Sequence, residues 1–278
     1  MRPATVIGCG GGGCNTVSRL DPHRIRVATI NTGSSGSEAT VALAGIDVSG
    51  CRGDPGLGWA LASDCREEIE ALVAGYSAVI AVAGLGGGTG AGAIPIVAEC
   101  AKARGALAIS VVSIPMSFEA GRRERALSQL REVVRISDRT LVMDMDRLKD
   151  AGGGPLPIRT AISMTDELMA IAISRLVNIL NGPFISIFDE RAYTMAFARS
   201  GDPAKAAEAA LGIPLYDAGP VQGKTVASPD GPLSASDAEQ VSMLISGVSG
   251  RVPEIVPHCS KGDGIMLFIP IPSRILLS

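Results

Sequence analysis

Aromatic side chains and histidines are scarce in this chain of 278 residues, which has 3% aromatic residues and two histidines. Proteins that bind single-stranded nucleic acid use aromatic rings as stacking platforms, and a Cys/His zinc site needs clustered ligands. Both kinds of site are therefore unexpected. The formal net charge of -3 also argues against a general nucleic-acid binder, which presents a basic face to the phosphate backbone.

Long apolar runs are lacking as well. No run reaches the roughly 20 residues that a membrane helix needs, and the N-terminal MRPATVIGCGGGG turns to glycine too early for a secretory signal. The six cysteines do not have the spacing of metal ligands, which favours free thiols in a reducing cytosol. We therefore expect a cytoplasmic protein that has no metal site built from its own side chains and does not insert into a membrane.

Short apolar runs alternate with helical patterns through the first part of the chain, as in a parallel sheet covered by helices. The longest helical pattern, Ala161–Leu180, stops at Asn181-Gly182-Pro183, which is a strong helix terminator. We predict an α/β fold with a Rossmann-like parallel-sheet domain over residues 1–160, a central helix over 161–181 and a smaller C-terminal α+β domain over 182–278.

The same periodicities predict the individual elements. Strands are expected at Thr5–Gly8, Arg26–Ile30, Ala78–Ala83, Ala106–Ile114, Thr140–Met143, Thr225–Ala227, Glu254–His258 and Gly264–Pro270. Besides the long helix, helices are expected from Asn15 and at Ser63–Val73, Ile94–Arg104, Arg122–Ile136, Ala204–Leu211 and Ala235–Val248.

Two glycine-rich segments each follow a predicted strand and precede a predicted helix. They are VIGCGGGGCN, Val6–Asn15, and AGLGGGTGAG, Ala83–Gly92. Glycines let the backbone approach a polyphosphate and turn successive N–H groups toward its oxygens, and the following helix N-terminus adds partial positive charge. Neither segment has the Gly-Lys-Ser/Thr of a Walker loop. Backbone N–H groups would therefore hold the phosphates, with Thr89 adding a hydroxyl.

The first segment alone leaves several interpretations open. Gly8, Gly10 and Gly13 satisfy the G-x-G-x-x-G pattern of dinucleotide sites, but other phosphate binding or tight packing of the turn fits equally well. A dinucleotide site favours an acidic residue at the end of the second strand, where this chain has Asn31. The second glycine segment, which a dehydrogenase does not need, shifts the balance away from that class.

The run GGGTGAG, Gly86–Gly92, resembles the signature loop of the tubulin/FtsZ family. The resemblance extends over nearly the whole chain through four further segments, which are Gly10–Asn15, Asn31-Thr32, Asp54–Gly58 and Pro115–Arg123. Two departures are Cys14 in place of a glycine and Gly33 in place of the usual aspartate. The second half of the chain matches only in pattern. The resemblance implies a divergent FtsZ-like, GTP-binding protein with the tubulin/FtsZ-like two-domain fold.

That resemblance also implies a site for GTP or GDP, with Mg²⁺ on the phosphates. The residues that it assigns to the nucleotide are Gly10, Gly11, Gly12, Asn15, Asn31, Gly87, Gly88, Thr89, Gly90, Glu119, Arg123 and Asp166. The glycines and Thr89 would hold phosphates, while Glu119 and Arg123 would meet the ribose and nearby phosphate oxygens. The alternative for Glu119 and Arg123 is a solvated helix start.

Asp166 lies near the start of the long helix, where the resemblance implies a contact with guanine. A carboxylate accepts from both the ring N–H and the exocyclic amine of guanine, whereas adenine presents an acceptor at that ring position. The alternative is an ordinary charged residue in the first turn of a helix. Met145 departs from the family pattern, which has an asparagine at that position.

In this family the carboxylates that hydrolyse GTP lie on a loop after the long helix and complete the site of the next subunit. The corresponding segment here is ISIFDE, Ile185–Glu190, in which Ile185 and Ile187 replace the family's asparagine and first aspartate. Asp189 and Glu190 are the candidate catalytic residues, with a charged helix start as the alternative. Carboxylates supplied by a second subunit would couple assembly to phosphoryl transfer.

Together these features predict a GTPase that assembles head-to-tail with itself, in cell division or a related cytoskeletal role. Other FtsZ-family subunits are further candidate partners. The altered catalytic segment leaves hydrolysis open. One alternative is a non-hydrolysing structural or regulatory homologue, and the other, from a different class, is an NAD-dependent Rossmann oxidoreductase.

Overall fold

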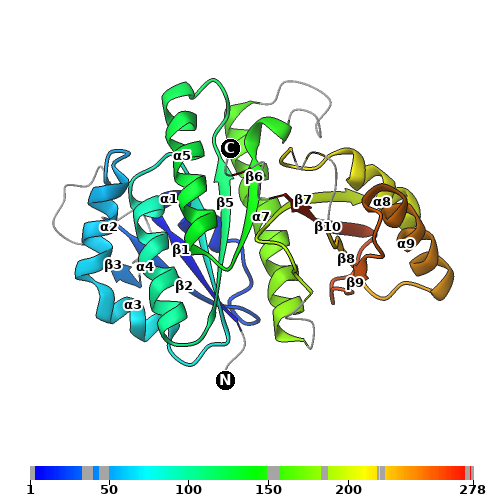
Figure 1. Cartoon of the computed structure of the whole chain (residues 1–278), viewed down its shortest axis with the longest axis horizontal. Coiled ribbons are helices and arrows are strands. Elements are labelled where there is room, and N and C mark those ends of the chain that lie inside the picture. Colours follow the sequence, from blue (N-terminus) through cyan, green and yellow to red (C-terminus); the bar gives the residue numbers. More distant parts are fainter. Residues whose placement is uncertain are drawn as a thin grey trace.

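A ten-stranded sheet forms the centre of the computed structural model (Figure 1), with strand order β3-β2-β1-β4-β5-β6-β7-β10-β8-β9. The structure describes residues 4–32, 40–43, 50–148, 157–182, 187–217, 219, 223–272 and 276. The strands are β1 Thr5–Cys9, β2 Arg26–Asn31, β3 Val41–Ala42, β4 Ala78–Gly84, β5 Leu107–Ile114, β6 Arg139–Asp144, β7 Ala192–Arg199, β8 Val226–Pro229, β9 Glu254–Ile255 and β10 Gly264–Ile271. Neighbours from β3 to β7 pair in parallel, whereas β10 is antiparallel to β7 and β8.

Helices cover both faces of this sheet. They are α1 Gly10–Val17, α2 Pro55–Asp64, α3 Arg66–Val73, α4 Thr89–Ala103, α5 Ala120–Ile136, the short 3-10 helix η1 Met145–Arg147, α7 Ile158–Asn181, α8 Pro203–Gly212 and α9 Ala235–Ser249. None of the helices in the described ranges is both long and apolar enough to cross a membrane.

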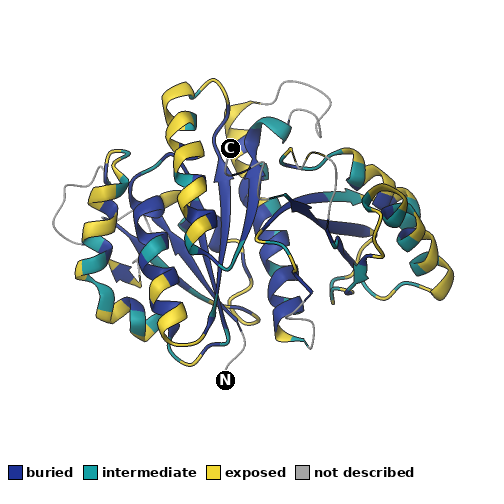
Figure 2. Ribbon diagram, viewed as in Figure 1, coloured by how far each residue is buried: buried dark blue, intermediate teal, exposed yellow. Residues whose placement is uncertain are grey.

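The core has one cluster of apolar side chains on each face of the sheet. On one face, α3, α4 and α5 bury Ile69, Ile94 and Leu130 against the strands. On the other face, α1 and α7 bury Val17 and Ile173. Figure 2 shows the strands buried through most of their length and the outward sides of the helices exposed. Burial on both faces explains why the central strands are continuous apolar runs instead of alternating patterns.

These features confirm the predicted α/β class with a mostly parallel sheet. The division into residues 1–160, 161–181 and 182–278 stays a prediction. Across that division β6 pairs with β7 in parallel, with Thr140 opposite Ala192, so one sheet continues from the first part into the last.

Several elements differ from the expectation. The helices after the glycine segments begin earlier, α1 at Gly10 and α4 at Thr89, because the first N–H groups of a helix need no partner within the helix and glycine is tolerated there. A break at Cys65 divides the expected helix over Ser63–Val73 into α2 and α3. Strand β7 was not expected, because its alanines and methionine give a weak strand signal that burial between β6 and β10 overrides.

Candidate functional site

A cavity of about 290 Å³ opens at the carboxyl ends of β1 and β4. In the sheet, β2 lies on one side of β1, and β4 and β5 lie on the other. The strand order therefore reverses its direction between β1 and β4, and open α/β sheets bind ligands at such a switch point. The lining residues are Cys9, Gly10, Gly11, Gly12, Gly50, Cys51, Arg52, Gly53, Gly84, Gly87, Gly88, Thr89, Gly90 and Arg122. The cavity therefore unites both glycine segments with a third loop, residues 50–53.

Some of these glycines are needed to pack the loops against one another. A Cβ on Gly10 would lie 2.7 Å from the backbone nitrogen of Gly90, and a Cβ on Gly90 would lie 2.6 Å from the carbonyl oxygen of Cys9. Gly10 also has a φ of +68°, a conformation that costs a residue with a side chain about 1–2 kcal/mol. A Cβ on Gly88 would lie 2.6 Å from the carbonyl oxygen of Asp54. These three glycines bring the three loops into contact.

Other glycines face the cavity itself. A Cβ on Gly11 would meet no protein atom within 4 Å, and the nearest atoms to one on Gly12 or Gly87 are at 3.3 and 3.8 Å. Packing of the protein therefore does not explain the glycine at position 11. A ligand that approaches the backbone closely would explain it.

Two helix N-termini meet at the cavity. Cys9 is the N-cap of α1 and Gly88 is the N-cap of α4, and neither forms a side-chain capping hydrogen bond. The first N–H groups of each helix lack partners within the helix, and both helix ends carry partial positive charge. Burial raises the pKa of the Cys9 thiol, so this residue brings no negative charge. The arrangement suits an anion with several oxygens.

Thr89 links the second glycine segment to its neighbours. Its Oγ1 lies 3.3 Å from Oγ1 of Thr32 and 3.3 Å from Sγ of Cys51, and the backbone N–H of Cys51 donates to it at 3.4 Å. The side chain is buried yet lines the cavity. Thr89 therefore fixes the loop at residues 50–53 against the start of α4.

The charged residues that line the cavity are Arg52 and Arg122. Nη1 of Arg122 donates to Glu119 Oε2 at 2.8 Å. The side chain of Gln129 on α5 holds the second glycine segment beside it, accepting from the N–H of Gly86 at 2.6 Å and donating to the carbonyl of Gly87 at 3.0 Å. Among the lining residues that the structure describes, none has a carboxylate.

Arg52 and Gln129 were not among the residues predicted from the sequence. The only sequence signal for Arg52 is a cation between glycines in the run GCRG, residues 50–53. Nothing in the sequence distinguishes Gln129 from any other polar residue on the surface of a helix.

Arg123 and Glu119 lie outside the lining of the cavity. Arg123 makes a bidentate ion pair with Asp144 at the end of β6, with N–O distances of 2.8 and 2.6 Å, and donates to the carbonyl of Pro115 at 2.7 Å. The buried Asp144 carboxylate raises the pKa of the Arg123 guanidinium. In this structure Arg123 therefore ties the start of α5 to the sheet, and Glu119 is the partner of Arg122.

Asp166 on α7 lies against α1, at the side of the first glycine segment. It is 8% exposed, and Thr16 Oγ1 lies 2.9 Å from Asp166 Oδ1 and 3.2 Å from the carbonyl oxygen of Gly12, so these two acceptors share the single hydroxyl proton of Thr16. Burial raises the pKa of the Asp166 carboxyl, although the bond from Thr16 opposes that effect. Asn31 is buried at the end of β2 and accepts from the N–H of Thr32, while Asn15 is exposed on α1.

Asp189 and Glu190 lie after α7 and outside the lining of the cavity. The Tyr193 hydroxyl donates to Asp189 Oδ1 and accepts from the N–H of Glu190, both at 2.9 Å. Arg251 lies 3.5 Å from the other oxygen of Asp189. Within one chain the structure therefore does not bring this pair to the glycine segments. Ile185, like Gly33, falls outside the described residues.

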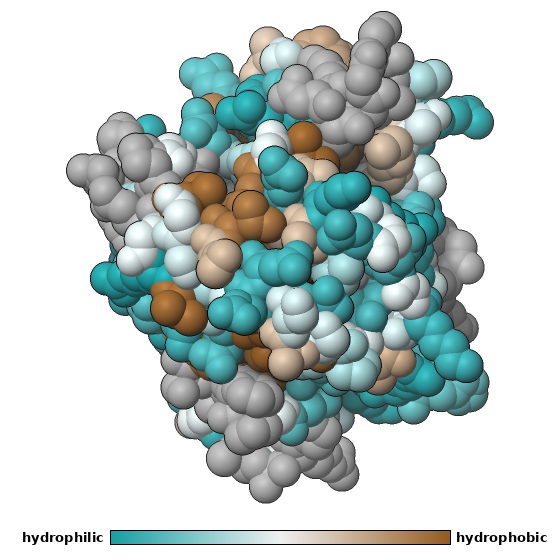
Figure 3. All heavy atoms as spheres, turned by 90° about the vertical axis from the view of Figure 1, so that its right-hand side faces the viewer, coloured by the Kyte–Doolittle hydropathy of each residue, from teal (hydrophilic) through white to brown (hydrophobic). Residues whose placement is uncertain are grey.

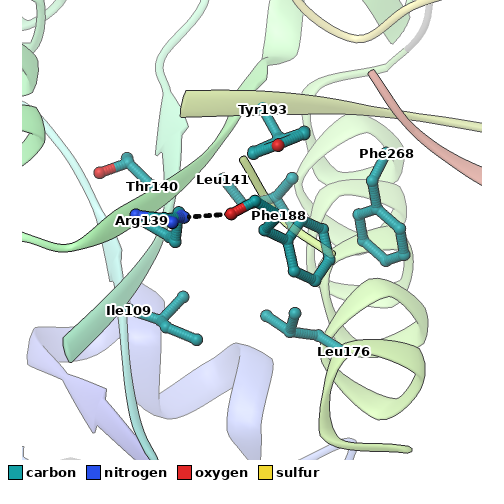
Figure 4. A pocket seen from close by; sticks show the side chains of 8 residues that line it. All are labelled: Ile109, Arg139, Thr140, Leu141, Leu176, Phe188, Tyr193 and Phe268. Carbon is teal, nitrogen blue, oxygen red and sulfur yellow. Dashed lines mark hydrogen bonds between the residues drawn. The ribbon is translucent and has the colours of Figure 1, made fainter. Parts of the chain in front are cut away.

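Aromatic packing anchors the segment that carries this pair (Figure 4). Phe188 stacks edge-on against Tyr193 and Phe268, with ring centroids 5.0 and 5.7 Å apart, and its carbonyl accepts from Arg139 Nε at 2.8 Å. The space between these side chains and Leu176 is only about 20 Å³, which fits an imperfectly filled core better than a ligand site. The pair therefore directly follows a buried aromatic side chain that is packed in the core.

No set of three or more His, Cys, Asp or Glu side chains within the described ranges is placed to hold a metal ion. The cavity instead offers backbone N–H groups and two arginines, which suit an anion.

The family model described as "Tubulin/FtsZ family, GTPase domain" matches residues 27–153. The cell division protein FtsZ 1 of Pyrococcus woesei is 31% identical over 242 residues, which are 76% of this chain and 64% of that protein. The chain spans from half to just under two thirds of the length of the curated relatives that it matches first.

Solved structures share the fold over almost the whole chain. A dimer of FtsZ from M. jannaschii aligns with a TM-score of 0.80 and 24% identity, covering 99% of this chain and 90% of that one. CetZ2 from Haloferax volcanii, solved as a GTPγS-bound protofilament, aligns with a TM-score of 0.79 and 16% identity, covering 99% and 96%.

Proposed function

Because this chain belongs to the tubulin/FtsZ family, we propose that it binds a guanine nucleotide in the glycine-lined cavity, assembles head-to-tail with copies of itself and hydrolyses GTP where two copies meet. The observation that carries the proposal is the convergence of two helix N-termini, without side-chain caps, on a cavity that Gly11 leaves open. Such N-termini bind phosphates through backbone N–H groups and partial positive charge.

The phosphates would lie over the open glycines. Gly11, Gly12 and Gly87 present backbone to the cavity, while the packing of Gly10 against Gly90 holds the two segments together. A preorganised set of N–H groups binds an anion without having to reorganise around it. Such a site would need no lysine in either glycine segment to bind phosphate.

The base would lie beside α7. Thr16 already donates to one oxygen of Asp166, and a carboxylate has further lone pairs for the ring N–H and amine of guanine. These bonds require the ionised carboxylate. Since burial raises the pKa of Asp166, nucleotide binding would weaken as the pH falls through that raised value.

Magnesium fits this site only together with the nucleotide. Mg²⁺ takes oxygen ligands and keeps several waters, often bound through substrate phosphates with one or two carboxylates. The described lining has no carboxylate, so phosphate oxygens, water and the Thr89 hydroxyl would hold the ion. When bound, it would neutralise phosphate charge, while the chain's own N–H groups fix the phosphate positions.

A second copy would supply the groups for hydrolysis. Asp189 and Glu190 are separate from the cavity within one chain, so a neighbour would have to bring them to it. Beside them, Arg251 contacts Asp189 and is followed by Val252, which is 70% exposed. Figure 3 shows apolar patches between hydrophilic side chains on the side of α8 and α9. CetZ2 in its protofilament supports the same form of assembly for this chain.

The altered segment favours a second candidate, a non-hydrolysing filament subunit in the cytoplasm. Ile187, at the position of the family's first aspartate, is 8% exposed and packs in the core. Asp189 is held by Tyr193 and Arg251. A site that lacks one carboxylate and restrains another would lose transition-state stabilisation, and each 1.4 kcal/mol lost slows turnover about tenfold.

One set of measurements tests both candidates. Nucleotide extracted after gentle purification identifies the ligand, and GDP or GTP is expected. Phosphate release measured alongside sedimentation, with GTP and Mg²⁺, then separates a GTPase from a scaffold. Polymer with phosphate release supports the first candidate and polymer without it supports the second. Binding of NAD without binding of GTP would contradict both.

A further inference from the structure

Arg52 has an unusual backbone conformation at the rim of the cavity. Within the described ranges it is the one residue other than glycine with a positive φ, at 49°, and it lies between Gly50 at +67° and Gly53 at +82°. Side chains rarely adopt this region because the Cβ crowds the following carbonyl. Such strain persists where the surrounding structure imposes it, and it is commonest at binding and catalytic sites. The loop therefore holds an arginine where a glycine would fit more easily.

Contacts between elements show in which order the parts of the site lie, from Asp166 at one end to the loop of Arg52 at the other. At one end, Asp166 on α7 accepts from Thr16 on α1. In the middle, the start of α1 packs on the start of α4 through Gly10 and Gly90. At the other end, the start of α4 packs on the loop of Arg52, since a Cβ on Gly88 would lie 2.6 Å from Cβ of Cys51. A nucleotide with its base at Asp166 and its phosphates over the glycines would thus point its last phosphate toward Arg52.

The charge at that end suits a terminal phosphate. Arg52 and Arg122 both line the cavity, and Arg125 lies beside the same loop, with Nη2 3.4 Å from a Cβ built on Gly53. Glu119 offsets the charge of Arg122. A guanidinium binds a phosphate through two parallel N–H bonds, with geometry that lysine cannot match. A terminal phosphate carries more negative charge than a bridging one, so a cation there discriminates triphosphate from diphosphate.

We propose that Arg52 contacts the terminal phosphate of bound GTP and gives the site its preference for triphosphate over diphosphate. The inference rests on the proposed binding of guanine nucleotide. Arg52 is then a specificity residue supplied by the same chain that holds the nucleotide, in addition to the acids that a neighbouring copy would supply.

Substitution of Arg52 by glycine separates a ligand contact from a structural role. Arg52→Gly removes the guanidinium and relieves the positive φ, so the melting temperature should stay the same or rise by up to about 4 °C. Affinity for GTPγS should fall about tenfold or more, as for loss of a charge-assisted contact. Affinity for GDP should change less than about threefold, because the phosphate that Arg52 contacts is missing. Arg52→Lys should recover only part of the GTPγS affinity.

The control is Arg125→Ala, which removes the same charge from a residue beside the loop that does not line the cavity. It should lower GTPγS affinity less than about threefold through long-range attraction alone. Titrations of the full chain with GTPγS and GDP, in Mg²⁺, distinguish the outcomes. Wild-type protein that binds neither nucleotide would contradict the proposed function itself. If the wild type binds nucleotide, three results would overturn the role of Arg52. They are unchanged affinities in Arg52→Gly, an equal loss of affinity for GTPγS and for GDP in Arg52→Gly, and a loss of GTPγS affinity in Arg125→Ala as large as that in Arg52→Gly.

Discussion

The glycine-lined cavity and the segment after α7 differ in which groups they offer to a ligand, since the cavity offers mainly backbone and the segment offers side chains. The cavity is built mainly from backbone, with loops held together by contacts such as those of Gly10 with Gly90. The segment at residues 187–190 depends on side chains, and there Ile187 is buried while Asp189 is tied to Tyr193. A backbone site tolerates changes of neighbouring side chains, whereas a site of carboxylates changes chemistry with each substitution. Under the proposed function, nucleotide binding would thus depend on backbone and hydrolysis on side chains, so that a substitution could change one without the other.

The largest effect is expected where a side chain would enter the open part of the cavity. Gly11→Val meets no protein atom near its Cβ, so the fold should be retained while the valine occupies the space for phosphate. GTP affinity should fall about 100-fold or more, through loss of several hydrogen bonds to a charged group. Titration and thermal unfolding measure the two effects. The control is Gly212→Val on α8, which also meets no atom within 4 Å, and equal affinities in the two variants would refute the site.

A change in the segment after α7 should affect turnover and leave binding intact. Asp189→Ala with Glu190→Ala is expected to slow phosphate release about 100-fold at assembling concentrations, because two acids are removed from the transition state. GTP affinity should stay within about twofold, since neither residue lines the cavity of its own chain. Glu239→Ala, an exposed acid on α9, is the control. Unchanged turnover in the double variant would remove these residues from the mechanism and place the catalytic groups elsewhere.

Asp166→Asn should change stability and binding in opposite directions. The amide keeps an acceptor for Thr16 but cannot accept from both donors of guanine, so GTP affinity should fall about tenfold. Thermal stability at neutral pH should rise, because burial disfavours the ionised carboxylate. Xanthosine triphosphate, which has a carbonyl in place of the amine, should bind the variant better than it binds the wild type. If Asp166→Asn has the same preference between GTP and xanthosine triphosphate as the wild type, the base of the nucleotide does not contact Asp166.

The smallest effect is expected from pH. The pKa of the Asp166 carboxyl is higher in the folded protein than in the unfolded chain. Its contribution to stability is therefore fully present below the pKa of the unfolded chain and is lost as the pH rises through the pKa of the folded protein. Guanine binding follows the opposite course, weakening by several-fold as the carboxyl is protonated. GTP affinity measured between pH 4 and pH 7 should fall toward low pH more steeply for the wild type than for Asp166→Asn. The same pH dependence of affinity in both proteins would contradict this role of the carboxyl.

The sequence predicted local features better than long-range ones. The glycines at 10–12 and at 87, 88 and 90 all line one cavity, because a strand–glycine–helix pattern fixes where each turn lies and parallel strands bring the turns to one edge. The ion pair of Arg123 with Asp144 could not be foreseen, since it joins residues from separate elements. Nor could the role of Gln129 in holding Gly86 and Gly87, which depends on how α5 packs across the loop.

In the proposed site, backbone N–H groups at the starts of α1 and α4 together hold one triphosphate. Amide NMR spectra of glycine-labelled protein, recorded with and without GTPγS and Mg²⁺, test it directly. The N–H signals of Gly11, Gly12 and Gly87 should shift most, while those of Gly201 and Gly212, outside the cavity, should not move. Saturated binding that leaves the three cavity signals in place would contradict the account.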